Sequence, residues 1–186
     1  KAAFLKGDMN FCAVRGELTR KAVKDEEEKL DIPTADAGIL AAEVLESLPS
    51  KRYDVGVIPI FVIFRIPGRQ IFIRSMKMPL HQCEGGAAGG DRQIAECRFI
   101  LSSSLHGLII ADSMGIPNLH VEFGTDFGDG YKFDDYYSAY GLTHKPYDMR
   151  TEPLPELAWI QEQYRIRPEA VEAKKKALRE VFSFFR

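Results

Sequence analysis

The sequence has few cysteines, no long apolar run and no excess of charge of one sign, and each of these features excludes a class of protein. The three cysteines among 186 residues, Cys12, Cys83 and Cys97, fit neither a zinc site nor a CxxC redox pair in number or spacing. No apolar run approaches the roughly 18 residues that span a bilayer. The net charge of −2 lacks the basic excess of nucleic-acid-binding domains. We therefore expect a soluble cytoplasmic protein with reduced, buried thiols.

The common phosphate-loop patterns are also missing. The run GGAAGG at 85–90 lacks the Lys-Ser/Thr pair of a P-loop, and no GxGxxG opens a helix directly after a strand. Its glycine content predicts a mobile loop. No signal-peptide pattern opens the chain, and its first residue is Lys rather than Met. We therefore expect it to be part of a longer protein.

What is present is a regular alternation of β-rich and helical stretches, in a chain that is 45% hydrophobic and 28% charged. This alternation predicts an α/β fold, a Rossmann-like parallel sheet with helices on both faces. Asp91 is expected to cap the third helix. The strands are expected at residues 11–16, 31–38, 53–64, 69–76, 98–104 and 116–123, and the helices at 17–30, 39–48, 91–97 and 105–115.

The last part of the chain has a different pattern. Residues 1–150 are interpreted as one Rossmann-like domain, and residues 151–186 as amphipathic helices that pack on it or reach toward an N-terminal half outside this sequence. Pro168 suits the first turn of the final helix, because its missing N–H would have no helical partner there.

The stretch SSSLHGLIIADSMGIPN at 102–118 carries the strongest chemical signal. Ser103 or Ser104 suits the N-cap of a helix that Gly115 ends. Ligands bind at the carboxyl ends of parallel strands, so this turn lies on the ligand side. The free N–H groups of the helix start suit a phosphate or carboxylate, and Gly107 leaves room for the ligand to approach them. His106 is either an anion contact or acid/base there, or a residue that only caps and packs.

Several stretches, taken in order, resemble the polysaccharide pyruvyl transferase family. The specific ones are SSSLHGLIIADSMGIPN (102–118) and AVRGELTRK (13–21), which resembles the family's Val-Arg-Gly-x-Leu-Thr-Arg stretch. Softer likenesses lie in IPTADAGILA (32–41), YDVGVIPIFV (53–62) and YKFDDYYSAYGL (131–142). The resemblance covers most of the chain.

This chain departs from the family pattern at a few positions. Ser104 stands where many members carry Arg, so one anion contact is expected to be weaker or to come from elsewhere. Ile60 stands where a His is common, so any role of that His is absent here. Ala35 and Ala37 stand where the family usually has Gly and Pro.

The resemblance implies a fold and a reaction. Family members resemble type B glycosyltransferases, with a site between two Rossmann-like halves, and this chain looks like the C-terminal half with its closing helices. The implied reaction moves a pyruvyl group from phosphoenolpyruvate to a sugar of an exopolysaccharide or cell-envelope glycan and forms a ketal. The implied partners are that donor and a glycan or lipid-linked acceptor, in the cytoplasm or at the inner face of the membrane. No metal or further cofactor is expected.

The resemblance also implies roles for individual residues. His106 is the expected acid/base, and the fork of Arg15 matches a phosphate or carboxylate. Asp36 either binds the acceptor or caps the helix that follows it, and His120 is expected to face the core. The expected donor-binding residues are Arg15, Ser103, Ser104, Gly107 and Lys132, and the expected acceptor-binding residues are Glu122 and Asp36.

Two other functions remain open from the sequence. One is a glycosyltransferase of the same architecture that uses a sugar nucleotide, although no acidic ribose contact follows a glycine-rich strand turn. The other is a non-catalytic domain that binds a partner, which the departures at Ser104 and Ile60 favour.

Overall fold

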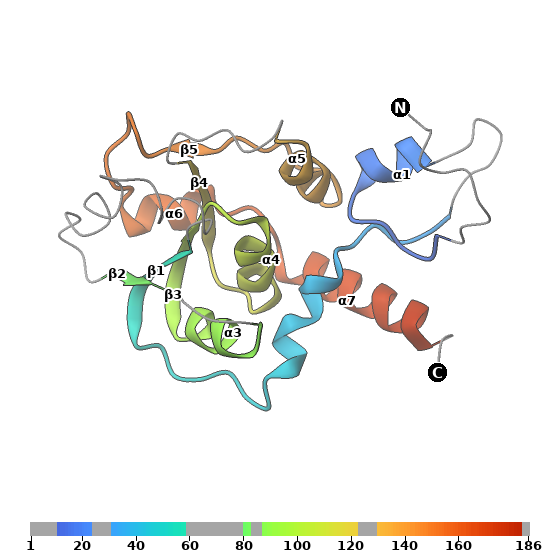
Figure 1. Cartoon of the computed structure of the whole chain (residues 1–186), viewed down its shortest axis with the longest axis horizontal. Coiled ribbons are helices and arrows are strands. Elements are labelled where there is room, and N and C mark those ends of the chain that lie inside the picture. The colour runs from blue at the N-terminus through green and yellow to red at the C-terminus, as the bar shows by residue number, and fades with distance from the viewer. Residues whose placement is uncertain (1–10, 24–30, 59–79, 83–86, 123–129, 184–186) are drawn as a thin grey trace.

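A parallel sheet of five strands lies at the centre of the fold (Figure 1). The computed structural model describes residues 11–23, 31–58, 80–82, 87–122 and 130–183. The strands, in spatial order, are β2 (Leu80–Gln82), β1 (Tyr53–Ile58), β3 (Cys97–Ser102), β4 (Asn118–Glu122) and β5 (Tyr147–Asp148). Every neighbouring pair is parallel, and the register sets Val55 beside Phe99 and Ile100 beside Asn118. All carboxyl ends therefore lie at one edge.

Helices cover both faces of this sheet, which confirms the predicted fold class (Figure 1). Ile160 of α6 packs on one face with Val57 and Leu101, while Ala111 of α4 packs on the other with Ile100. The helices are α1 (Glu17–Val23), the 3-10 helix η1 (Ala37–Val44), α3 (Ala87–Ala95), α4 (Leu105–Ser113), α5 (Tyr131–Ser138), α6 (Leu157–Gln163) and α7 (Pro168–Ser183). No helix in these ranges is long and apolar enough to cross a membrane.

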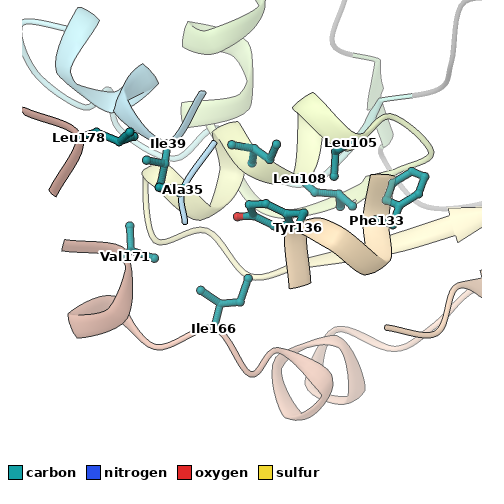
Figure 2. Packing of buried hydrophobic residues seen from close by; sticks show 10 residues of the cluster. Ala35, Ile39, Leu105, Leu108, Phe133, Tyr136, Ile166, Val171 and Leu178 are labelled. Atoms are coloured by element: carbon teal, nitrogen blue, oxygen red, sulfur yellow. The ribbon is translucent and has the colours of Figure 1, made fainter. Parts of the chain in front are cut away.

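Helix α4 is the central helix of the fold. Its sequence LHGLIIADS is apolar on nearly every side, which predicts burial all round. Leu105 and Leu108 of α4 pack with Phe133 and Tyr136 of α5, and η1 and α7 close the same cluster (Figure 2). On this side, α4 therefore covers the sheet, and η1, α5 and α7 form a further layer over α4.

The carboxyl end of α4 is closed in the way its sequence predicts. Gly115 takes the left-handed conformation, with φ of 65°. Its N–H donates to the carbonyl of Asp112, and the N–H of Ile116 donates to that of Ala111, which is a Schellman motif. The buried ammonium of Lys175 on α7 donates to the carbonyl of Ser113, 2.8 Å away. A cation in this position is favoured by the helix dipole.

A buried carboxylate joins α4 to its neighbours. Asp112 is fully buried and accepts hydrogen bonds from the hydroxyl of Tyr136 (2.7 Å) and the amide of Asn118 (2.6 Å). The hydroxyl of Tyr164 bonds to it as well. Burial outweighs these bonds and raises the pKa of Asp112 to about 7.

Three predicted elements differ in the structure. Residues 11–16 and 31–38 form no strands and share one parallel bridge, Val14 to Thr34, because Pro33 has no N–H with which to extend a ladder. The predicted loop at 85–90 is wrong from Ala87 on, because α3 begins there. Asp91 therefore lies inside this helix rather than at its cap. Burial of Ile94 against the sheet side of α4 outweighs the poor helix propensity of the two glycines.

The remaining elements follow the sequence in outline. The predicted helix over 39–48 is a 3-10 helix that ends at Val44, and Pro168 begins α7 as expected. Both closing helices pack on the α/β domain, and the division of the chain at residue 150 stays a prediction. The predicted strand over 69–76, and the parts of predicted elements at 24–30 and 59–64, lie outside the described residues.

The raised pKa of Asp112 predicts an unusual pH dependence of stability. Because this pKa lies above that of the unfolded chain, about 3.9, the folded state holds the proton more tightly. The resulting stability is full below pH 4 and is lost as the pH rises through about 7. In Asp112→Asn, which cannot titrate, we expect the free energy of unfolding in urea to fall less between pH 4.5 and 8 than in the wild type. Exposed Asp54→Asn should keep the wild-type slope, and equal slopes in Asp112→Asn and wild type would refute this assignment.

Candidate functional site

The turn between β3 and α4 is held in place by its own serines. The hydroxyl of Ser102 accepts from the N–H of Ser104 (3.0 Å) and lies 3.1 Å from the carbonyl of Ile58, to which it can donate. The N–H of buried Ser103 donates to the same carbonyl. The turn is thus tied to the carboxyl end of β1, so its backbone is fixed before any ligand binds.

The start of α4 lacks a side-chain cap. Ser104 is the N-cap residue by its backbone conformation, as predicted, yet its side chain makes no capping hydrogen bond. The first N–H groups of an α-helix have no partner within the helix. In the described part of the chain no side chain caps the N–H groups of the first turn of α4, so they can donate to an anion in the direction that the helix dipole favours.

His106 and Gly107 follow in the first turn and differ in burial. The side chain of His106 is exposed, whereas Gly107 is buried. A Cβ at position 107 would lie 2.5 Å from the hydroxyl of Ser102 and 2.9 Å from Ile58. The close packing of α4 on β1 and β3 therefore explains this glycine, rather than the room for a ligand that the sequence suggested. Gly107 can still offer its N–H.

A second group of predicted residues meets as an ion pair. Nε of Arg15 lies 2.9 Å from Oδ2 of Asp36. The other oxygen of Asp36 accepts from the N–H of Gly38 at the start of η1, so the capping role predicted for Asp36 is confirmed. The ion pair leaves the terminal nitrogens of Arg15 without a partner in the described part of the chain. A partly exposed guanidinium with its fork open is suited to bind an anion.

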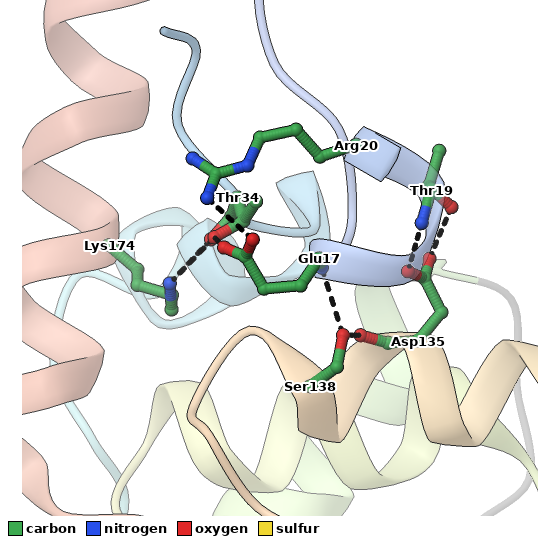
Figure 3. Close-up of polar contacts among 7 residues, drawn as sticks. All are labelled: Glu17, Thr19, Arg20, Thr34, Asp135, Ser138 and Lys174. Atoms are coloured by element: carbon green, nitrogen blue, oxygen red, sulfur yellow. Dashed lines mark hydrogen bonds and ion pairs between the residues drawn. The ribbon is translucent and has the colours of Figure 1, made fainter. Parts of the chain in front are cut away.

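The segment that carries Arg15 is docked on α5 by close packing and hydrogen bonds (Figure 3). A Cβ at Gly16 would lie 1.7 Å from the carbonyl oxygen of Asp135, so only glycine permits this approach. The carboxylate of Asp135 accepts from the N–H (2.8 Å) and the hydroxyl (2.6 Å) of Thr19, and the N–H of Glu17 donates to the hydroxyl of Ser138. Gly16 and Thr19 of the Arg-Gly-x-Leu-Thr pattern thus specify the docking of α1 on α5.

The other predicted contacts lie around the end of β4 and the start of α5. Glu122 is the last residue of β4 and is partly exposed, and Lys132 is the second residue of α5. The charge of Lys132 contributes to a lowered pKa of His120, so the two side chains are neighbours. Among the described residues, no hydrogen bond or ion pair joins His106 to Arg15 or to Lys132. Among the described residues, the predicted site residues therefore form three separate groups rather than one bonded cluster.

The sequence did not predict a buried pair of histidines. Nδ1 of His120 lies 2.7 Å from Nε2 of His144, and Nδ1 of His144 lies 3.6 Å from the carboxylate of Asp134. Both imidazoles stack with the ring of Phe133. Burial lowers the pKa of His120 to about 3 and also lowers that of His144, so both rings are neutral at pH 7. Strand alternation correctly placed His120 inward, but nothing local in the sequence links it to His144.

Fold and site together define the chain as a Rossmann-like parallel α/β domain with a candidate anion site at a helix start. The profile of one family, polysaccharide pyruvyl transferase, matches residues 10–123, more than half of the chain. The chain belongs to this family. The match covers the N-terminal and central part of the chain, including Arg15, Asp36 and the whole β3–α4–β4 unit, whereas the likeness at 131–142 lies outside it.

The chain is also similar to a viral protein of unassigned function. It is 29% identical over 155 residues to uncharacterized protein L143 of Acanthamoeba polyphaga mimivirus. The aligned region covers 79% of this chain and 54% of the relative, so the chain spans about half of that protein's length. No solved structure matches the chain significantly.

The two bonds of Asp36 can be separated by substitution. Asn caps a helix about as well as Asp does, so Asp36→Asn should keep the bond to Gly38 and change the free energy of unfolding by less than about 0.5 kcal/mol. Asp36→Ala loses the cap and should lower it by about 1 kcal/mol in urea denaturation. An equal loss in both variants would mean that the ion pair with Arg15, rather than the cap, carries the stability.

Proposed function

We propose that this chain is part of an enzyme that transfers a pyruvyl group from phosphoenolpyruvate to a sugar and forms a cyclic ketal. The observation that carries the proposal is the uncapped start of α4, with exposed His106 at the carboxyl end of β3, in a member of the pyruvyl transferase family. The whole protein acts on a glycan or lipid-linked acceptor of exopolysaccharide or cell-envelope assembly, in the cytoplasm or at the inner face of the membrane.

The reaction places definite demands on the site. Two hydroxyls of the sugar each lose a proton and form a bond to C2 of the donor, C3 gains a proton, and phosphate leaves with the cleaved C–O bond. The donor brings a phosphate and a carboxylate, which need cations and N–H donors. The reaction therefore needs proton transfer at three atoms, the two hydroxyl oxygens and C3. One hydroxyl proton balances the proton gained by C3, and the other leaves with the phosphate. None of these transfers needs a metal or a further cofactor.

The residues divide these tasks by their chemistry. Arg15 holds one anionic group of the donor with its open fork. The start of α4 holds the other, through the hydroxyls of Ser103 and Ser104 and the N–H groups of the first turn up to Gly107. Lys132 adds positive charge from α5. His106, exposed beside that first turn, is the acid/base.

The acceptor side is assigned to Glu122 at the end of β4. Asp36 was expected there too, but both of its oxygens are engaged, one by Arg15 and one by Gly38. We therefore assign Asp36 a positioning role. Its ion pair with Arg15 holds the guanidinium in place, so that Arg15 loses less side-chain entropy when its fork binds the anion.

The test is turnover by the full-length protein. It is incubated with phosphoenolpyruvate and polymeric or lipid-linked galactosides and glucosides, and both phosphate and the ketal are measured. Acceptor-dependent formation of both supports the proposal. Turnover of a sugar nucleotide without phosphate release from phosphoenolpyruvate would assign a glycosyltransferase instead. Turnover of neither, in a folded protein, would favour a non-catalytic binding domain, as the serine at position 104 suggests.

Replacing His106 is expected to reduce catalysis without unfolding the protein. Loss of an acid/base group typically costs 10²–10⁴-fold, so kcat of His106→Ala should fall by about 100-fold or more. Because His106 is exposed, the circular dichroism spectrum and the melting temperature should stay those of the wild type. Wild-type turnover in His106→Ala would show that this histidine only caps or packs and takes no part in the reaction.

Replacing Arg15 is expected to act on the donor. Charge-assisted bonds contribute about 1.5–3 kcal/mol, so Arg15→Ala should raise KM for phosphoenolpyruvate about tenfold or more. Arg98→Ala is the matched control, because Arg98 is an exposed arginine near the opposite end of β3. An unchanged KM in Arg15→Ala, or the same increase in both variants, would refute the assignment.

A further inference from the structure

A cavity of about 580 Å³ lies at the sheet edge where β4 meets β5, and none of the residues assigned to the transfer reaction lines it. Its walls come from the first half of β4, the chain over residues 142–148 and the region from Trp159 of α6 to Ile166. Small-molecule sites typically measure roughly 300–1,000 Å³. The cavity is thus large enough to hold a small organic ligand.

Two aromatic rings form a fixed wall of this cavity. The rings of Tyr147 and Trp159 lie 5.2 Å apart between centroids at a tilt of 58°. The hydroxyl of Tyr147 donates to the carbonyl of Pro153, which holds the ring in place. The side chain of Trp159 is unusually open for an indole, since the residue is 37% exposed. An open indole on a fixed platform offers a flat π-face to the C–H groups of a ligand.

The polar groups of the cavity balance in charge. Lys145 and Arg165 are positive, and Asp148 and Glu152 are negative. Asp148 is already held by the guanidinium of Arg150, which lowers the pKa of its carboxyl to about 2. The four ionised side chains that line the cavity therefore sum to zero, and Arg150, bonded to Asp148, adds one positive charge. The charge of the wall alone thus does not select between a neutral and an anionic ligand.

Neutral donors and acceptors complete the lining. The amide of Gln163 and the hydroxyl of Thr143 can each both donate and accept hydrogen bonds. The imidazoles of His120 and His144 also line the cavity, and burial keeps both neutral. An aromatic platform surrounded by groups that both donate and accept suits a ligand with an apolar face and hydroxyl edges.

We propose that this cavity binds a neutral sugar unit of a glycan, with one face of the sugar ring on the indole of Trp159, the ring of Tyr147 against its edge, and its hydroxyls on the surrounding polar side chains. The inference does not rest on the transfer reaction, because the cavity contains neither His106 nor Arg15. If the transfer also takes place, the cavity is a holding site for the glycan outside the centre where the ketal forms.

Trp159 makes the binding directly observable. It is the one tryptophan of the sequence, so the emission of the chain reports on this cavity. The 186-residue chain is titrated with neutral oligosaccharides of glucose, galactose and mannose, without phosphoenolpyruvate. We expect a saturable change in emission with at least one of them, together with weaker quenching by acrylamide. Phosphoenolpyruvate alone should give no response.

Matched variants separate stacking from folding. Aromatic contacts of this kind are worth about 0.5–1.5 kcal/mol, so Tyr147→Ala should weaken binding by about two- to tenfold. Tyr147→Phe loses the bond to Pro153 but keeps the ring, so it should bind nearly as the wild type does. Gln163→Ala, at the exposed end of α6, should weaken binding without disturbing the fold. Phe182→Ala on α7 removes an exposed ring outside the cavity and should change nothing.

Three results would overturn the proposal. The first is no saturable response to any saccharide while acrylamide still quenches Trp159 freely. The second is a response to phosphoenolpyruvate alone, which would make the cavity an anion site. The third is a Trp159 already shielded from acrylamide in a dimer of the chain, which would make the cavity a protein contact.

Discussion

The burial of α4 is the constraint on which the rest of the structure depends. This helix packs on the sheet at one side and on η1, α5 and α7 at the other, so each of these elements is placed by its contact with α4. A helix that is apolar nearly all round leaves few ways to fix its rotation. The bonds of Asp112 to Tyr136, Asn118 and Tyr164 fix the rotation of α4 about its axis, because all of them are satisfied in one orientation of the helix. This arrangement places the carboxyl of Asp112 in a low-dielectric interior, where burial disfavours its charged form and raises its pKa.

The candidate site inherits its geometry from this packing. The β3–α4 turn is bonded to β1 through Ser102 and Ser103, and Gly107 lets the first turn lie directly on the strands. Arg15 comes from a separate segment, and the contact of Gly16 with α5 fixes its place. The two anion-binding groups of the proposed site thus sit on different elements of one packed unit, and neither depends on a long flexible loop.

The sequence predicted the parts of this fold whose signals are local. The unit from β3 to β4 is where expected, since strand alternation, the N-cap serine and Gly115 all act within a few residues. The class of fold follows from the same alternation. The prediction failed where tertiary contacts decide: α3 forms through the glycines because Ile94 is buried, and Val14 and Thr34 make only a bridge. Likewise, the pairing of Arg15 with Asp36 and of His120 with His144 joins residues 21 and 24 positions apart, which no local pattern encodes.

The two ends of α4 are treated very differently. At the carboxyl end the carbonyls are occupied, by the N–H groups of Gly115 and Ile116 and by the ammonium of Lys175. At the amino end Ser104 leaves its capping bond unmade. The negative pole of the helix is therefore compensated inside the protein, whereas in the described part of the chain no side chain caps the positive pole. In electrostatic terms, the described contacts leave α4 closer to a fixed fractional positive charge at the carboxyl edge of the sheet than to a balanced dipole.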